Sequence, residues 1–297
     1  MTAQRPSLRV ALASSRIDIL EMMRQACAGS GFLPVLAVVP PVLWRERTRE
    51  TDPATRLAKV RAATPPEMGV LALPAADLPD ALRLFGVDMV VVCGYPTLLP
   101  PFVVDTLPGG GINCHPSLLP RWQGPSPISW ALRMGDPRIG LSVHRMNGDT
   151  YDSGPVLAQD TLPTPDDDFD PATLHARAIR RLVRGVLPKA LAAVLRGEPG
   201  TLQDPNAATW AGFMDHADRY LDRGQSPLTL HHLTRALRYL RWTPHIRIDG
   251  AWHTITRTSP TPTPTCNRRV DCANGAPLWV ADATPAPVNT AHPRIYT

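Results

Sequence analysis

An unbroken apolar run constrains the fold of this 297-residue chain more than any other stretch. Residues 89–92 read Met-Val-Val-Val, and an extended backbone points successive side chains to opposite faces. Both faces of this strand must therefore be buried, as in a parallel sheet that is covered by helices on both sides. The run predicts an α/β protein with a mainly parallel sheet.

Strand and helix patterns alternate on both sides of this run, which is typical of an α/β domain. We predict strands at residues 7–15, 33–39, 69–73, 87–93, 140–146 and 155–159. We predict helices at residues 17–30, 78–85, 127–134 and 171–197, the last of them kinked or divided at Pro188. This alternation predicts a catalytic α/β domain at residues 1–203.

The composition changes after about Gly200. A linker at residues 204–206 precedes one helical segment at 228–240 and strand-like pieces at 245–248 and 252–256. A Pro/Thr tract follows, and Asn274-Gly275 predicts a hairpin within residues 270–281. We predict a second, small β-rich domain at residues 204–297, either OB-like or a truncated barrel.

Composition narrows the class of protein. The apolar fraction of 43% is enough for a globular core, and no run of eighteen apolar residues predicts a membrane span. The amino terminus lacks the form of a signal peptide, and five scattered cysteines without metal-ligand spacing predict reduced thiols in the cytoplasm. A net charge of +5 permits an anionic ligand without requiring nucleic acid. The acidic run 166–168 predicts a solvated loop rather than a metal site. The sequence leaves open whether the protein forms a homodimer.

Two loops follow predicted strands at the edge where open α/β sheets bind ligands. The turn at residues 13–16 predicts substrate contacts from Ser14, Ser15 and Arg16, although an ordinary helix start explains it equally well. The loop at residues 94–100 is too apolar for simple exposure. A flat heteroaromatic ring fits against Leu98 and Leu99, or these leucines pack the next helix.

An amide and an imidazole lie two residues apart in the next predicted strand. Asn113 and His115 share one face, where both can donate to an oxygen that gains negative charge. Asp152, in a polar loop, can favour the imidazolium form of His115 or take a proton from an attacking amine. Ser117 lacks a nucleophile-elbow pattern. The residues indicate direct attack of a bound nucleophile on a bound carbonyl, while a core histidine and a plain turn aspartate stay open.

Three segments resemble the signature of the folate-dependent formyltransferases: INCHPSLLPRWQGPSPISWAL at 112–132, GLSVHRM at 140–146 and YDSGPVLAQ at 151–159. The resemblance implies a Rossmann-like domain that uses 10-formyltetrahydrofolate, with Asn113, His115 and Asp152 at catalytic positions and no metal. It also implies a set of cofactor-binding residues: Pro96, Thr97, Leu98, Leu99, Ser117, Leu118, Val143 and Asn147.

The acceptor is predicted from departures within this family. The turn at 13–16, the proline after His115 and the segment 142–145 resemble the small-molecule enzymes more closely than methionyl-tRNA formyltransferase. We therefore predict a small-molecule amine acceptor: an amino sugar, a hydroxyornithine-like amino acid or another natural-product intermediate. The basic stretch 45–61 keeps tRNA as the second candidate, and a folate-binding regulator without catalysis is the third. The absent phosphate-binding loop disfavours the purine-synthesis enzyme, and the absence of a domain before Ser7 disfavours the deformylase.

Overall fold

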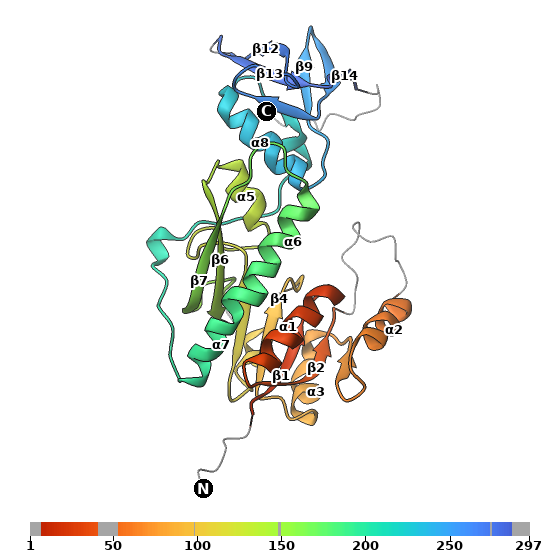
Figure 1. Ribbon diagram of the computed structural model, residues 1–297, viewed down its shortest axis with the longest axis vertical. Helices are drawn as coiled ribbons and strands as arrows, with labels where there is room; N and C mark the ends of the chain where they lie inside the picture. The colour runs from red at the N-terminus through yellow and green to blue at the C-terminus, as the bar shows by residue number, and fades with distance from the viewer. Residues whose placement is uncertain (1–6, 41–52, 98, 148–149, 274, 287–297) are drawn as a thin grey trace. The chain divides into compact units, whose positions relative to one another are not determined.

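The structure is a computed structural model that describes residues 7–40, 53–97, 99–147, 150–273 and 275–286. It consists of two compact units, and Figure 1 colours the chain from end to end. Unit 1 comprises Met1–Gly124, Gly140–Leu162 and Arg177–Trp210, whereas unit 2 comprises Pro125–Ile139, Pro163–Ala176 and Ala211–Thr297. The domain boundary predicted between residues 203 and 204 stays a prediction about which parts fold independently.

A seven-stranded sheet in the order β3-β2-β1-β4-β5-β6-β7 confirms the predicted α/β class (Figure 1). Strands β1 to β5 are mutually parallel where they pair, and β6 is antiparallel to β5. The strands are β1 (Arg9–Ala13), β2 (Leu33–Val38), β3 (Gly69–Leu71), β4 (Met89–Cys93), β5 (Gly111–His115), β6 (Arg138–Arg145) and β7 (Val156–Pro163).

Helices cover both faces of the parallel part of the sheet, as the apolar run in β4 requires. Alternate residues of β4, Val90 and Val92, join a buried cluster with α3 (Leu78–Leu84) and α4 (Pro101–Val104). The opposite face packs against α1 (Ile17–Gly29), whose Cys27 lies close to Cys93 and Cys114. Burial raises the pKa of Cys27 to about 12, and all five cysteines are free thiols.

The long helical segment is divided close to Pro188, as predicted. Helix α6 (Pro171–Arg181) continues into the π-helical segment η2 (Leu182–Val186) and then into α7 (Leu187–Leu195). Pro188 has no N–H for a bond to the preceding turn, so it fits only near the start of a new helix. Unit 1 also contains α2 (Pro53–Ala63), η1 (Ala75–Asp77) and η3 (Pro205–Ala207).

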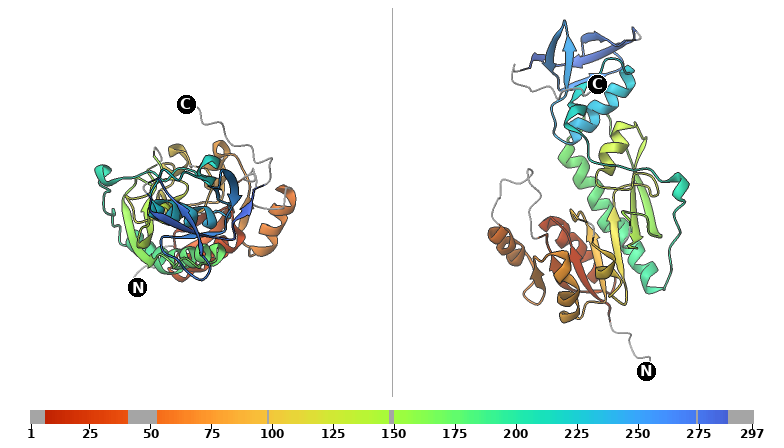
Figure 2. Two further views of the ribbon diagram at one scale, coloured as in Figure 1. Left: turned by 90° about the horizontal axis from the view of Figure 1, so that it is seen from above. Right: turned by 180° about the vertical axis from the view of Figure 1, so that it is seen from behind.

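In its described residues, unit 2 combines helices with two small sheets, which confirms the predicted β-rich part (Figure 2). Helix α5 (Pro127–Arg133) packs on α8 (Pro227–Tyr239). The sheets have the orders β14-β10-β9-β8 and β11-β13-β12. Their strands are β8 (Tyr220–Leu221), β9 (His245–Ile248), β10 (Ala251–Thr254), β11 (Arg257–Ser259), β12 (Arg268–Asp271), β13 (Pro277–Ala281) and β14 (Thr284–Pro285), and η4 (His216–Arg219) precedes them. The predicted hairpin is the antiparallel pair β12 and β13.

The acidic run lies in an exposed loop, as its composition predicts, and two of its carboxylates also form ion pairs. The Asp167 carboxylate lies 3.1 Å from His231 Nε2 and 3.2 Å from Arg235 Nε, both on α8. Asp168 pairs with Arg257 of β11 at 2.9 Å. The buried Arg235 guanidinium on α8 needs a counter-charge, and the sequence alone could not show that Asp167 contacts His231, 64 residues later. The exposed acidic loop therefore also supplies a counter-charge to the buried Arg235 of α8.

We expect unit 2 to lose stability as the pH falls below about 6.5. Burial lowers the pKa of His231, and the facing Asp167 only partly offsets it, with Arg235 and His232 adding positive charge nearby. A folded-state pKa below the unfolded value means that the unfolded chain binds the proton first, so stability declines as the pH falls from 6.5 through the folded pKa. Denaturant unfolding at pH 7.5 and 5.5 measures this loss, and His231→Gln should reduce it. An unchanged pH dependence in His231→Gln would contradict the assignment.

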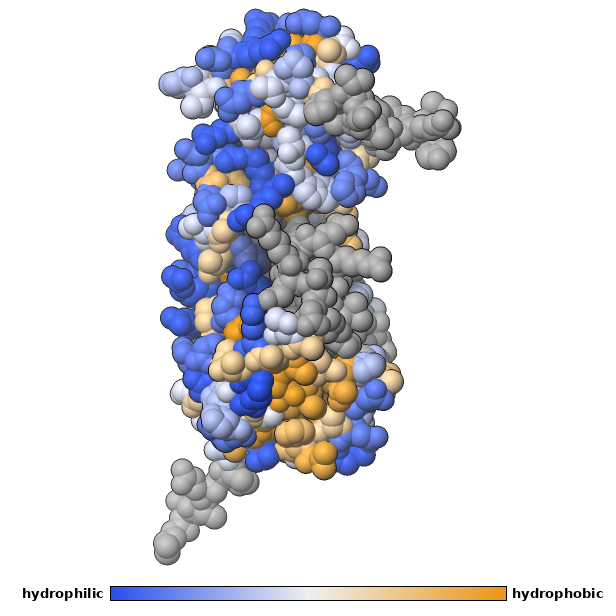
Figure 3. All heavy atoms as spheres, turned by 90° about the vertical axis from the view of Figure 1, so that its right-hand side faces the viewer, coloured by the Kyte–Doolittle hydropathy of each residue, from blue (hydrophilic) through white to orange (hydrophobic). Residues whose placement is uncertain are grey.

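The surface carries one apolar area on the side seen in Figure 3. This view faces the side of unit 1 that bears α2 and the edge strand β3. Leu33 and Leu84 are among the exposed apolar side chains of unit 1.

Over the described ranges of the chain, none of the helices has the length and apolar character needed to cross a membrane.

Candidate active site

Strand β5 brings the predicted amide and imidazole to one face of the sheet. In the antiparallel pairing with β6, Asn113 is opposite His144 and His115 is opposite Ser142, so all four side chains share that face. Cys114 pairs with Val143 on the other face. The period of a strand therefore places Asn113 and His115 together, as predicted, and adds two polar residues from β6.

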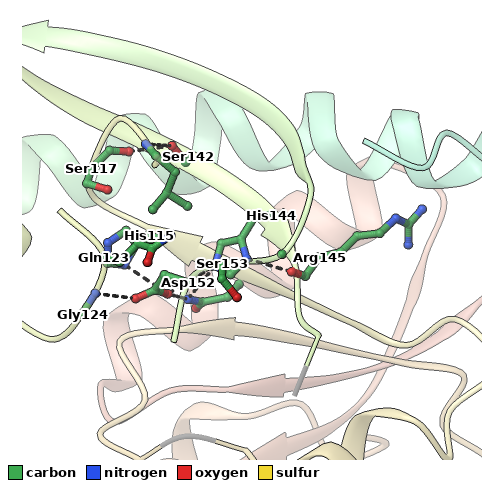
Figure 4. A network of polar contacts seen from close by, with 12 residues as sticks. His115, Ser117, Gln123, Gly124, Ser142, His144, Arg145, Asp152 and Ser153 are labelled. Carbon is green, nitrogen blue, oxygen red and sulfur yellow. Dashed lines mark hydrogen bonds and ion pairs between the residues drawn. The ribbon is translucent and has the colours of Figure 1, made fainter. Parts of the chain in front are cut away.

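Asp152 completes this group and contacts three parts of unit 1 (Figure 4). Its Oδ1 accepts a hydrogen bond of 2.9 Å from Asn113 Nδ2 and lies 3.4 Å from His115 Nδ1. The same oxygen lies 3.3 Å from His144 Nε2, while Oδ2 accepts from the Gly124 amide at 2.9 Å. Asp152 is only 7% exposed and has a left-handed backbone, with φ of 54°. Asn113 and His115 thus both lie against the buried Asp152 carboxylate.

Burial and charge act in opposite directions on this group. Burial is the largest effect on Asp152 and raises its pKa, but His115, His144 and the Gly124 amide together bring it well below the usual value. For His115, burial is again the largest effect and lowers the pKa, which Asp152 and the Trp122 carbonyl only partly counteract. At neutral pH the carboxylate is charged. Burial therefore disfavours the imidazolium form of His115 that the sequence predicts. The prediction differed because a sequence shows the neighbouring charge but not the burial.

Two backbone carbonyls fix the protons on the imidazoles. His115 Nε2 lies 2.8 Å from the Trp122 oxygen, and His144 Nδ1 lies 2.8 Å from the Arg145 oxygen. A carbonyl only accepts, so each of these ring nitrogens carries the hydrogen. Neutral His115 then presents the lone pair of Nδ1 toward Asp152, and His144 Nε2 lies 3.3 Å from both Asn113 Nδ2 and Asp152 Oδ1. His115 Nδ1 is therefore the position where this pair can gain a proton.

The two predicted ligand loops meet at the carboxyl edge of the sheet. The Ser15 amide and hydroxyl both donate to the Gly94 carbonyl, at 3.2 and 2.8 Å. Strands β1 and β4 are neighbours although β2 and β3 intervene in sequence, so this is the switch point where open α/β sheets bind ligands. Ser14 is fully buried, and Arg16 forms an ion pair with Asp18 at 2.6 Å.

The predicted cofactor residues are not all placed alike. Thr97 is exposed and Pro96 half-buried, whereas Leu99 belongs to the core cluster with α3 and α4. Leu98 lies outside the described residues. The Leu99 side chain therefore packs in the core with the next helix, α4, which is the alternative that its sequence left open.

The remaining predicted cofactor residues, which lie in two other segments, also differ in burial and in their distance from the site. Leu118 is 45% exposed, and the buried Ser117 hydroxyl has no hydrogen-bond partner within the described part of the chain. Asn147 bonds Ser153, next to Asp152, at 2.9 Å. Val143 is fully buried on the face away from Asn113. The structure thus brings Asn147 toward the site but not the Val143 side chain.

The sequence interpretation missed the groups that hold Asp152 and His115. His144 alternates with Ser142 along a predicted strand, so its face was predictable, but its register against Asn113 was not. The Gly124 amide and the Trp122 carbonyl are backbone groups without a sequence signal. Within the described ranges, no group of three or more metal-ligating His, Cys, Asp or Glu residues occurs.

The geometry and the fold agree with a known family. Residues 19–191 match the family model described as formyl transferase. The chain belongs to the formyl transferase family.

Among known proteins, the chain is similar to two kinds of formyltransferase. It is 36% identical over 163 residues to methionyl-tRNA formyltransferase of Herminiimonas arsenicoxydans, covering 54% of this chain and 50% of the relative. The chain therefore matches about half the length of that relative. An N-formyltransferase structure from Helicobacter canadensis, in complex with folinic acid and dTDP-3-aminofucose, has a TM-score of 0.64 at 11% identity and covers 94% of this chain and all of that one. At that identity, the likeness shows the fold alone.

Proposed function

We propose that the protein transfers a formyl group from 10-formyltetrahydrofolate to the amine of a small molecule. The observation that carries this proposal is the convergence of Asn113, His115 and His144 on the buried, charged Asp152 carboxylate. Membership of the formyl transferase family supports the reaction class. We further propose a cytoplasmic location and an acceptor that is a natural-product intermediate.

The site residues divide the work between the carbonyl oxygen and the amine proton. The donor supplies a formyl carbon that the amine attacks, forming a C–N bond as the bond to N10 of the folate breaks. Asn113 Nδ2 can turn its longer hydrogen bond, the 3.3 Å contact with His144, toward the oxygen that gains charge. The proton released by the amine goes to His115 Nδ1, and Asp152 stabilises the imidazolium that forms. Folate N10 takes up this proton from His115 as it leaves, which returns the imidazole to its neutral form.

Two observations support a binding site for the formyl donor at the carboxyl edge of the sheet. The loop at Pro96 and Thr97 lies beside the Ser15 turn at the switch point. The buried Ser117 hydroxyl lacks a partner in the described residues, as expected for a polar group that a ligand or water completes. Both observations support a planar, hydrogen-bonding ligand at this edge.

The acceptor separates two candidate functions. The Helicobacter canadensis title names an amino sugar nucleotide, which supports a small-molecule amine. The relatives named methionyl-tRNA formyltransferase keep tRNA as the second candidate. The test is to supply purified protein with 10-formyltetrahydrofolate and a panel of sugar, amino-acid and tRNA amines, and to measure tetrahydrofolate release. Release only with aminoacylated initiator tRNA would replace the proposal with the second candidate, and folate binding without any release would leave a folate-binding regulator.

An exposed aromatic pair beside Asp152 is expected to affect the acceptor rather than the donor. Tyr151 and Trp210 are 43% and 54% exposed, and their ring centroids lie 5.8 Å apart in an edge-to-face arrangement. Tyr151 precedes Asp152, and Trp210 bridges to Gln123, next to Gly124. Aromatic contact is typically worth about 1 kcal/mol beyond area burial, so Trp210→Ala should raise the acceptor KM by roughly fivefold. Steady-state kinetics should show an unchanged folate KM, with Leu195→Ala, also an exposed apolar side chain, as control. An unchanged acceptor KM would contradict this role.

A further inference from the structure

One side chain outside the predicted site connects the two backbone segments that enclose Asp152. Gln203 Nε2 donates to the carbonyl oxygen of Asp152 and to that of Gly154, both at 2.7 Å. Gln203 Oε1 accepts from Gln123 Nε2 at 3.0 Å. Gln123 directly precedes Gly124, whose amide donates to the Asp152 carboxylate. A single carboxamide therefore joins the loop that carries the carboxylate to the loop that binds it.

The backbone of Asp152 needs such a connection. A left-handed conformation is unfavourable for a residue with a side chain, and it persists where surrounding bonds over-determine it. The two carbonyls that Gln203 binds belong to Asp152 itself and to the second residue after it. Rotation of this turn would move the carboxylate away from Asn113 and His115.

Gln203 is itself held on a fixed segment. Two residues earlier, Thr201 exchanges both backbone hydrogen bonds with Val156 of β7, each 2.8 Å long. One residue later, the Asp204 carboxylate caps η3 by accepting from the Asn206 amide at 2.9 Å. The segment therefore approaches the site as a short rigid connection, and the side chain of Gln203 has a defined origin.

We propose that Gln203 is a positioning residue that holds the Asp152 carboxylate against Asn113 and His115 by fixing the backbone of residues 152–154. The inference deepens the proposed function, since it concerns the same carboxylate, but the geometry that it claims exists without any substrate. A glutamine suits this place because one carboxamide supplies two hydrogens for the carbonyls and an oxygen for Gln123.

The test compares Gln203→Met with Gln123→Met and with Gln25→Met on the full chain. Methionine matches the length of glutamine but removes its hydrogen bonds and adds no charge. Gln203→Met should lower kcat by roughly 10- to 100-fold with the folate KM unchanged. Gln123→Met leaves both carbonyl bonds in place and should have a smaller effect. Gln25→Met is the control and should leave kcat unchanged. Gln25 is exposed on α1, where it donates to Glu21 and accepts from Arg184.

A second measurement needs no substrate and separates this inference from the proposed function. The imidazole of His115 faces Asp152, His144 and the Trp122 carbonyl. If the carboxylate moves away, the NMR titration of His115, assigned with His115→Gln, should shift to lower pH by roughly one pH unit in Gln203→Met. The shift would support the inference even if no amine were formylated. A wild-type titration of His115 in Gln203→Met, or a loss of kcat that only follows a lower melting temperature, would overturn it.

Discussion

Replacing Asp152 with asparagine is expected to lower kcat by about 1,000-fold, the middle of the range for a lost general base or its orienting partner. The substitution keeps the shape of the side chain and an oxygen that can accept from the Gly124 amide. It removes the negative charge that raises the pKa of His115 against the effect of burial. The imidazolium that forms when the amine loses its proton would then lack its counter-charge.

Single-turnover measurements with saturating folate and acceptor test this directly. Asp77→Asn provides a matched control, because Asp77 is an exposed carboxylate of unit 1 at the start of α3 whose side chain makes no capping bond. The folate KM should stay close to wild type in both variants. A kcat of Asp152→Asn within threefold of wild type would show that the carboxylate does not take part in the chemistry.

The fold was largely predictable because its strongest signals are local. The apolar run in β4, the almost continuous burial of its neighbours β1 and β5 and the proline near the start of α7 each follow from one stretch of backbone. Predicted strand ends are less accurate. Strand β7 continues to Pro163, whereas the predicted strand ends at residue 159. The polar residues 160 and 161 suggested an end there, but both are half-buried within the strand. The acidic run is exposed as predicted, but its ion pairs with α8 could not be predicted, since those partners are distant in sequence.

The candidate site was predictable only where side-chain period or family motif specified it. Two residues of one strand had to share a face, so Asn113 and His115 were found. The carboxylate at position 152 was predicted from its polar loop between two strands and then from the family motif, whereas spacing could not show that it faces His115. His144 required the register between two strands, and Gln203 required the path of a segment that follows α7. Backbone partners at Trp122 and Gly124 could not be read from side-chain chemistry at all.

Gly154→Ala is expected to lower the free energy of unfolding by about 3 kcal/mol, because the added methyl group overpacks the backbone beside the site. A Cβ built at Gly154 would lie 1.9 Å from the carbonyl oxygen of Arg145. That oxygen cannot move freely, because it accepts from His144 Nδ1 and belongs to a residue whose amide donates to the Pro155 carbonyl at 2.8 Å. The glycine allows the Asp152 loop to lie directly on the end of β6.

Gly29→Ala separates this steric effect from the general effect of adding a methyl group. Gly29 is the last residue of α1, and a Cβ there would have no neighbour within 4 Å. Alanine should therefore leave stability equal or raise it by up to about 1 kcal/mol. Urea denaturation of both variants, compared at equal m-values, measures the difference. Equal midpoints for Gly154→Ala and wild type would mean that β6 and the Asp152 loop are not in contact, and the bonds that place the carboxylate beside Asn113 would then have no fixed support.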